Sequence, residues 1–211
     1  MIRFTRGIVL FGACAAVAAC AKKNNAADSA AAADSAAKAA AAAAPPPAPA
    51  PAPLSDANIL ALLDEINMAD SANGNVAATK GTASEVKAYG REMERDHHAL
   101  RKSGQDLAKK INVTPAAPAN DTLPATSTKM LANLNGAAKG AAFDKTYIDQ
   151  EVAVHQFVLS SLQGMQTAAT DTTLKATIGK VIPMIQQHLD QGQKIQTKLA
   201  AAPAADSTKK K

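Results

Sequence analysis

The stretch from Val86 to Ile111, VKAYGREMERDHHALRKSGQDLAKKI, has the residue spacing that decides the fold. Apolar and small residues recur there at steps of three and four: Val86, Tyr89 and Gly90, Met93, His97, Leu100, Gly104, Leu107 and Ile111. This period is typical of one buried face of an α-helix. The capping-box pattern Thr82-x-x-Glu85 precedes the stretch and predicts where the helix begins. A histidine therefore lies on an otherwise apolar helix face.

Three further segments between Leu54 and Ala200 show the same helical period. The first begins at an N-cap, Ser55 or Asp56, and continues to about Thr79. Another begins near Phe143 and Asp144, and the last follows the N-cap Asp171. The sequence therefore predicts an all-α domain of four long helices.

The links between these segments predict how the helices are connected. A few residues around Gly81 join the first two helices and a few around Thr170 join the last two, so each pair forms an antiparallel hairpin. About 30 residues, 112–142, separate the hairpins and contain three prolines and one short helix at 127–135. A link of that length can return along the bundle and make the middle helices parallel. This connectivity predicts a ferritin-like four-helix bundle, not an up-down-up-down bundle.

The N-terminus predicts export and lipidation. Arg3 and Arg6 precede a short apolar run, and the sequence Val17-Ala18-Ala19-Cys20 resembles a bacterial lipobox. We therefore expect residues 1–19 to be a lipoprotein signal peptide, with Cys20 as the lipidated first residue of the mature protein. Ala21 favours an outer-membrane lipoprotein facing the periplasm, so the expected membrane contact is through the lipid anchor.

Low-complexity segments flank the predicted domain. Residues 20–53 are rich in Ala and end in PPPAPAPAPAP, which predicts an extended, disordered tether. Residues 201–211 form a Lys-tipped tail that suits either plain solvation or contact with cell wall, envelope proteins or anionic lipid. The helical domain is thus expected at residues 54–200, which hold no Cys and therefore no disulfide.

The charge pattern argues against nucleic-acid binding. The chain carries a net charge of +5, yet residues 54–200 contain fifteen Lys and Arg and fifteen Asp and Glu residues. The positive excess therefore lies in the terminal segments. The chain has no Trp, and few aromatic residues remain in the domain, so neither a basic groove nor stacking platforms are expected.

Polar residues fall on the apolar faces of all four predicted helices. At about 1.5 Å per residue, Asp70, His97, His155 and His188 each lie about 16 to 20 Å from the same end of the bundle. Glu151 lies one turn before His155, and His98 is turned about 100° away from the buried face. The spacing therefore predicts one polar layer in the middle of the bundle.

Two interpretations of this layer remain open. It can be a buried, hydrogen-bonded layer that fixes the register of the helices. Alternatively it is a site for Fe, Mn or Zn, formed by Asp70, His97, Glu151, His155 and His188. Glu94-x-x-His97 matches one element of a di-iron site, but Ile185 occupies the place where a second such element needs Glu. No catalytic residue is predicted, and the metal alternative includes a redox role.

Three stretches together resemble a known family. They are residues 74–97 (GNVAATKGTASEVKAYGREMERDH), 143–156 (FDKTYIDQEVAVHQ) and 174–189 (LKATIGKVIPMIQQHL). They are similar to the bacterial family called domain of unknown function 4142, whose members are outer-membrane or secreted proteins. The resemblance implies a ferritin-like four-helix fold and an envelope location. It implies no reaction, so a non-catalytic binding or structural module is the function expected, with partner and oligomeric state left open.

Overall fold

The computed structural model describes residues 53–201, which form helices with no strand among them. The helices are α2 (Asp56–Lys80), α3 (Ser84–Lys110), α4 (Leu123–Gly136), α5 (Ala141–Ala168) and α6 (Thr172–Ala201). The prediction of an all-α domain is confirmed for this part of the chain. The predicted signal peptide, lipidated Cys20, tether and tail lie outside the described residues, apart from Pro53 and Ala201.

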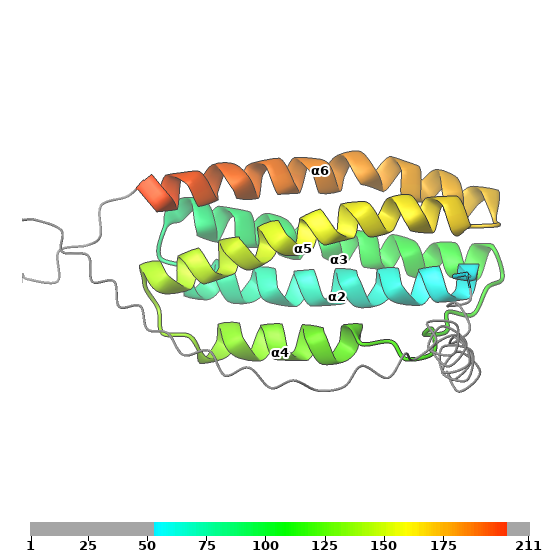
Figure 1. Cartoon of the computed structure of the whole chain (residues 1–211), viewed down its shortest axis with the longest axis horizontal. Coiled ribbons are helices and arrows are strands. Elements are labelled where there is room, and N and C mark those ends of the chain that lie inside the picture. Colours follow the sequence, from blue (N-terminus) through cyan, green and yellow to red (C-terminus); the bar gives the residue numbers. More distant parts are fainter. Residues whose placement is uncertain (1–52, 202–211) are drawn as a thin grey trace, which may run out of the picture. The chain divides into compact units, whose positions relative to one another are not determined.

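The four long helices lie side by side, and α4 lies along the outside of α2 (Figure 1). Helices α2 and α3 form one antiparallel hairpin, and α5 and α6 form the other. The link from α3 returns along the bundle through α4, so α3 and α5 run in the same direction (Figure 1). Contacts between α2 and α5, and between α3 and α6, join the two hairpins.

Two of the three predicted N-terminal caps are present in the structure, and one is not. Ser55 caps α2 in a capping box with Asn58, and the Asp171 carboxylate accepts hydrogen bonds from the Thr173 and Leu174 amides at 2.8 and 2.9 Å. The capping box predicted at Thr82 is wrong, because α3 begins after Ala83 without a side-chain cap. Thr82 instead donates both its amide and its hydroxyl to Asp144 of α5.

Two aspartates join the hairpins. Each aspartate belongs to one hairpin and accepts hydrogen bonds from the turn of the other. Asp144, at the start of α5, accepts the Thr82 and Ala83 amides of the α2–α3 turn at 2.8 and 2.7 Å. Asp56, at the start of α2, accepts the amides of residues 170 and 171 in the α5–α6 turn at 2.8 and 3.0 Å. The two hairpins are therefore tied together at both ends of the bundle by equivalent contacts.

Two glycines let α2 and α3 approach closely. A Cβ atom on Gly74 would lie 2.6 Å from the backbone oxygen of Gly90, and one on Gly90 would lie 2.8 Å from that of Gly74. Any larger residue would force the backbones apart. This close approach explains why α2 and α3 each have a glycine at the point of contact.

The buried core is divided into two apolar clusters. One contains Ile59 and Leu62 of α2 with Leu162 and Leu174 of the second hairpin. The other contains Tyr89, Met93, Phe143, Tyr147 and Ile195, among others. In every long helix a buried polar residue lies between the residues of the two apolar clusters: Asp70 in α2, His97 in α3, His155 in α5 and His188 in α6. The middle of the bundle is therefore a polar layer.

Candidate metal centre

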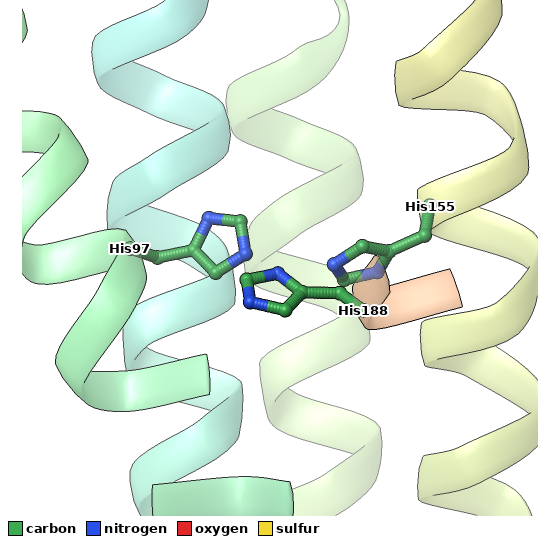
Figure 2. Close-up of side chains that lie close together, drawn as sticks. All are labelled: His97, His155 and His188. Atoms are coloured by element: carbon green, nitrogen blue, oxygen red, sulfur yellow. The ribbon is translucent and has the colours of Figure 1, made fainter. Parts of the chain in front are cut away.

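Three imidazoles meet in this polar layer, each from a different helix. The ring centroids of His97, His155 and His188 lie 5.4 to 5.6 Å from one another (Figure 2). The residues are 0%, 0% and 1% exposed. One ligand nitrogen of each ring lies within 4.8 Å of one nitrogen of each of the others. The prediction that the three rings share one level is confirmed.

Each ring is held by a hydrogen bond to one of its two nitrogens. Nδ1 of His97 lies 2.9 Å from Oδ1 of Asn67, whose amide is oriented because Nδ2 donates to the Leu63 carbonyl at 2.6 Å. Nδ1 of His155 lies 2.9 Å from the Glu151 backbone carbonyl, and Nε2 of His188 lies 3.2 Å from the Asp96 carboxylate. All three partners are acceptors, so these ring nitrogens carry the proton.

The second nitrogen of each ring is therefore a lone-pair acceptor. Nε2 of His97, Nε2 of His155 and Nδ1 of His188 are buried and have no hydrogen-bond partner among residues 53–201. In Figure 2 each ring turns a nitrogen toward the centre of the group. Three acceptors with no donor between them leave a centre that only a cation or a donor molecule can satisfy.

Burial keeps the imidazoles neutral. It lowers the pKa of His97 well below its usual range, and the neighbouring His155 and His188 lower it further because their positive charges would repel. Burial also lowers the pKa of His155, to about 4, and that of His188. The lone pairs are therefore available at neutral pH, as metal coordination requires.

The carboxyl groups of Asp70 and Glu151 lie behind the rings, not among the unpartnered nitrogens. Oδ2 of Asp70 is 3.6 Å from Nδ1 of His97, and Oε2 of Glu151 is 3.6 Å from Nδ1 of His155. Those nitrogens already have hydrogen-bond partners, and 3.6 Å is too long for another. The structure thus brings the three predicted histidines together as a ligand group and places the two predicted carboxyl ligands beside it.

These two carboxyl groups are protonated more easily than usual. Burial raises the pKa of Asp70 to about 7, and burial together with the charge of Asp70 raises the pKa of Glu151 well above its ordinary value. Oδ2 of Asp70 and both carboxyl oxygens of Glu151 lack hydrogen-bond partners in the described part of the chain. Burial therefore favours the neutral form of both carboxyl groups.

A second group of ligand atoms lies on the outer side of His188. Glu92, Asp96 and His188 each place one ligand atom within 4.8 Å of the others, and both carboxylates are half-buried. The Arg95 guanidinium lowers the pKa of Asp96. The Glu92 carboxylate accepts a hydrogen bond from Gln191 at 2.8 Å. Asp96 therefore orients His188, and both carboxylates already have protein hydrogen-bond partners.

Two residues near the layer fall outside both groups. Glu94 is half-buried and is not among the groups of converging ligand atoms found in residues 53–201. The Glu94-x-x-His97 pattern therefore does not assemble a di-iron element. His98 is exposed, as its spacing predicts.

Comparison with known proteins places the chain in a family. The sequence model of a family described as a domain of unknown function (DUF4142) matches residues 36–195, well over half of the chain. The protein belongs to this family. The DUF4142 chain matches no curated protein and no solved structure. Its function must therefore be argued from the site itself.

The site of this DUF4142 protein has the donor set of a transition-metal centre. Neutral imidazoles suit Zn²⁺, Cu²⁺, Ni²⁺ and Fe²⁺, whereas Mn²⁺ favours carboxylate and water ligands. The hydrogen bonds from the outer ring nitrogens to Asn67, Glu151 and Asp96 are the orienting contacts that metal-bound histidines usually make. The residues present therefore fit a divalent ion bound by nitrogen.

Proposed function

We propose that this DUF4142 protein is an envelope lipoprotein whose helical domain is a non-catalytic binding module for one transition-metal ion, and that the ion is Zn²⁺. The observation that carries the proposal is the group of three buried ring nitrogens without partners, from His97, His155 and His188. Leaving a buried acceptor unsatisfied costs about 1–3 kcal/mol. One divalent cation removes that cost at all three nitrogens.

The hydrogen bonding favours a metal over a purely structural polar layer. A structural layer would pair the imidazoles with Asp70, Glu151 and the tyrosine hydroxyls. Instead the carboxyl oxygens of Asp70 and Glu151 lie 3.6 Å from Nδ1 of His97 and Nδ1 of His155, and the Tyr89 hydroxyl donates to the His188 backbone carbonyl at 3.1 Å. The three imidazoles, Asp70 and Glu151 therefore do not satisfy one another's hydrogen-bonding atoms.

The ligand set also favours zinc over iron or manganese. A di-iron or di-manganese bundle site uses about four carboxylates and two histidines. Here the converging atoms are three nitrogens, and the Asp70 and Glu151 carboxyl groups lie behind the rings. The three histidines are at most 1% exposed as whole residues, so the surface offers a substrate no direct path to the ring nitrogens. This closure supports binding or stabilisation, not redox catalysis.

The arrangement of the helices supports a ferritin-like topology as part of this proposal. The two hairpins are antiparallel, and the crossover through α4 makes α3 and α5 parallel (Figure 1). The equivalent ties from Asp56 and Asp144 to opposite turns suit two hairpins related by an approximate twofold axis.

Zinc titration of the full-length protein tests the metal proposal. Calorimetry should give one equivalent for the wild type, and His97→Gln, His155→Gln or His188→Gln should each weaken binding by more than the roughly 10–100-fold usual when only an orienting partner of a ligand is lost. His98→Gln is the matched control, because His98 is exposed on the same helix. Zinc binding that survives all three inner substitutions would overturn the metal proposal, and circular dichroism would check that each variant is folded.

The lipoprotein part of the proposal rests on Cys20 and its lipobox-like surroundings. Within residues 53–201, no helix is long and apolar enough to cross a membrane. If a lipid on Cys20 is the membrane contact, Cys20→Ser should move the protein from the membrane fraction to the soluble fraction after cell disruption. Unchanged fractionation would remove the lipid anchor from the account and leave the metal site unaffected.

A further inference from the structure

Two of the three rings in the candidate metal centre have buried groups behind them. The outward nitrogen of His97 contacts the Asn67 side chain, and that of His155 contacts the Glu151 backbone carbonyl. Both of these contacting residues are buried. The way from solvent to the inner nitrogens is therefore closed behind these two rings.

The third ring, His188, differs because a charged and partly exposed group lies behind it. Its Nε2 lies 3.2 Å from the Asp96 carboxylate, and the Asp96 side chain is 21% exposed. Glu92 is half-buried and places a carboxylate oxygen within 4.8 Å of a ligand atom of each of these two residues. Nδ1 of the same ring is buried and has no hydrogen-bond partner in residues 53–201. His188 therefore lies between the inner centre and two carboxylates near the surface.

We propose that Glu92 and Asp96 form the port through which zinc enters the protein, and that His188 passes the ion from this port to the centre. The inference rests on the proposed zinc-binding function. Carboxylates and imidazole are both ligands that zinc accepts. Rotation of the His188 ring about χ2, a torsion with broad preferences, moves the Nδ1 lone pair out of the centre to take up the ion. The reverse rotation brings the ion to His97 and His155.

The hydrogen bonds of the port suit brief capture of an ion, not permanent binding. Glu92 accepts from the neutral Gln191 amide at 2.8 Å, a partner that does not cancel its negative charge. Asp96 pairs with the Arg95 guanidinium at 2.7 Å, which weakens its attraction for a second cation. The three inner nitrogens have no competing partner in the described part of the chain. An ion therefore gains by moving from the port to the centre.

A cavity against α2 and α3 is a less favourable entrance. Its volume is about 320 Å³, and it is lined by Asn67, which contacts His97. Its charged lining residues, Asp64 and Arg101, form an ion pair at 3.1 Å, so their charges cancel. Clefts lined by one sign of charge concentrate ions of the opposite sign. The Glu92 side of the bundle has that property, and this cavity does not.

Stopped-flow zinc uptake by metal-free, full-length protein tests the port, with a coloured zinc chelator as the reporter. Glu92→Gln should slow zinc association about tenfold, the lower end of the effect that a charged cleft has on association rates. The dissociation rate should fall by the same factor, because a group on the route acts in both directions. Glu94→Gln is the matched control. It removes the same charge from the same helix, and Glu94 is half-buried but lies outside both ligand groups found in residues 53–201.

A conservative variant and the dissociation rate make the test decisive. Glu92→Asp keeps the charge and should recover most of the wild-type association rate. Equal association rates for Glu92→Gln and Glu94→Gln would overturn the port and leave the metal proposal standing. Faster zinc loss from Glu92→Gln than from the wild type would also overturn it, because Glu92 would then hold the bound ion. A wild type that takes up no zinc would overturn the metal proposal itself, and the port with it.

Discussion

Asp144 and Asp70 are both buried aspartates on long helices, 1% and 2% exposed, yet their surroundings are opposite. Asp144 accepts the Thr82 and Ala83 amides and the Thr82 hydroxyl, and so joins the two hairpins. Oδ2 of Asp70 has no donor among the described residues. Burial alone therefore does not reveal the role of a polar residue. Its hydrogen bonds separate residues that maintain the fold from residues whose polar atoms stay unpaired.

The same contrast applies to whole regions of the bundle. At its ends, the carboxylates of Asp56 and Asp144 satisfy the backbone amides of the turns. In the middle, the three imidazoles and the Asp70 and Glu151 carboxyl groups keep unpaired atoms between two apolar clusters. Because unpaired buried groups destabilise a protein, the middle layer is the region where a bound ligand would stabilise it most.

The largest change in the free energy of unfolding is expected at Asp144, whose carboxylate accepts hydrogen bonds. Asp144→Asn replaces an acceptor with an amide that faces backbone donors, so it should lower the free energy of unfolding by about 2–3 kcal/mol. Asp70→Asn removes a buried carboxyl that has no donor to lose, so the change should stay within about 1 kcal/mol. Urea unfolding of both variants at pH 7 measures the difference. A larger loss for Asp70→Asn would contradict the comparison between the two aspartates.

The next effect is a pH dependence with opposing contributions from the middle layer. Because the folded protein lowers the histidine pKa values, the three imidazoles contribute stability that is present above about pH 6.5 and is lost on acidification. The raised pKa values of Asp70 and Glu151 act the other way, because they contribute stability at low pH that is lost as the pH rises toward 7.

On acidification the imidazoles lose stability and the two carboxyls gain it, so removing one carboxyl should expose more of the loss from the imidazoles. The unfolding free energy of metal-free Glu151→Gln should therefore fall more steeply on acidification below about pH 6 than that of the wild type. Urea titrations of both proteins, with a metal chelator, measure the two slopes. Equal slopes, or a shallower slope for the variant, would contradict the assigned protonation states.

The smallest effect is expected when one ring of the layer becomes apolar. In chelator-treated protein, His97→Leu removes the unpartnered Nε2 but leaves the Asn67 oxygen without its donor. These two changes nearly cancel, so the unfolding free energy should stay within about 1 kcal/mol of the wild type. Thermal and urea unfolding measure it. A variant that fails to fold would show that the layer holds the bundle together without any ion.

Much of this architecture can be predicted from the sequence, because the regular rise of a helix converts residue number into depth. That regularity was enough to place His97, His155 and His188 at one level, with His98 exposed. The short links at residues 81–83 and 169–171 likewise predicted the two hairpins. Helix period and link length are local properties, so they can be read without knowing the contacts.

The contacts that decide the chemistry could not be predicted in the same way. Asn67 and Asp96 fix which nitrogen of His97 and of His188 remains unpartnered, yet they lie on neighbouring helices and follow no spacing rule relative to those rings. Asp70 and Glu151 occupy the predicted level, but side-chain direction places them behind the rings. The Thr82 capping box failed for a related reason, since Asp144 from a distant segment takes its donors.

X-ray absorption spectroscopy at the zinc edge, on full-length protein loaded with one equivalent, tests the central claim most directly. Three imidazole nitrogens should appear at about 2.0–2.1 Å, the distance usual for zinc bound by histidine. His155→Gln, compared with His98→Gln as control, should remove one imidazole from the spectrum. A shell of oxygen atoms without the scattering pattern of imidazole would contradict the account, because the ion would then be bound somewhere other than the three-histidine centre.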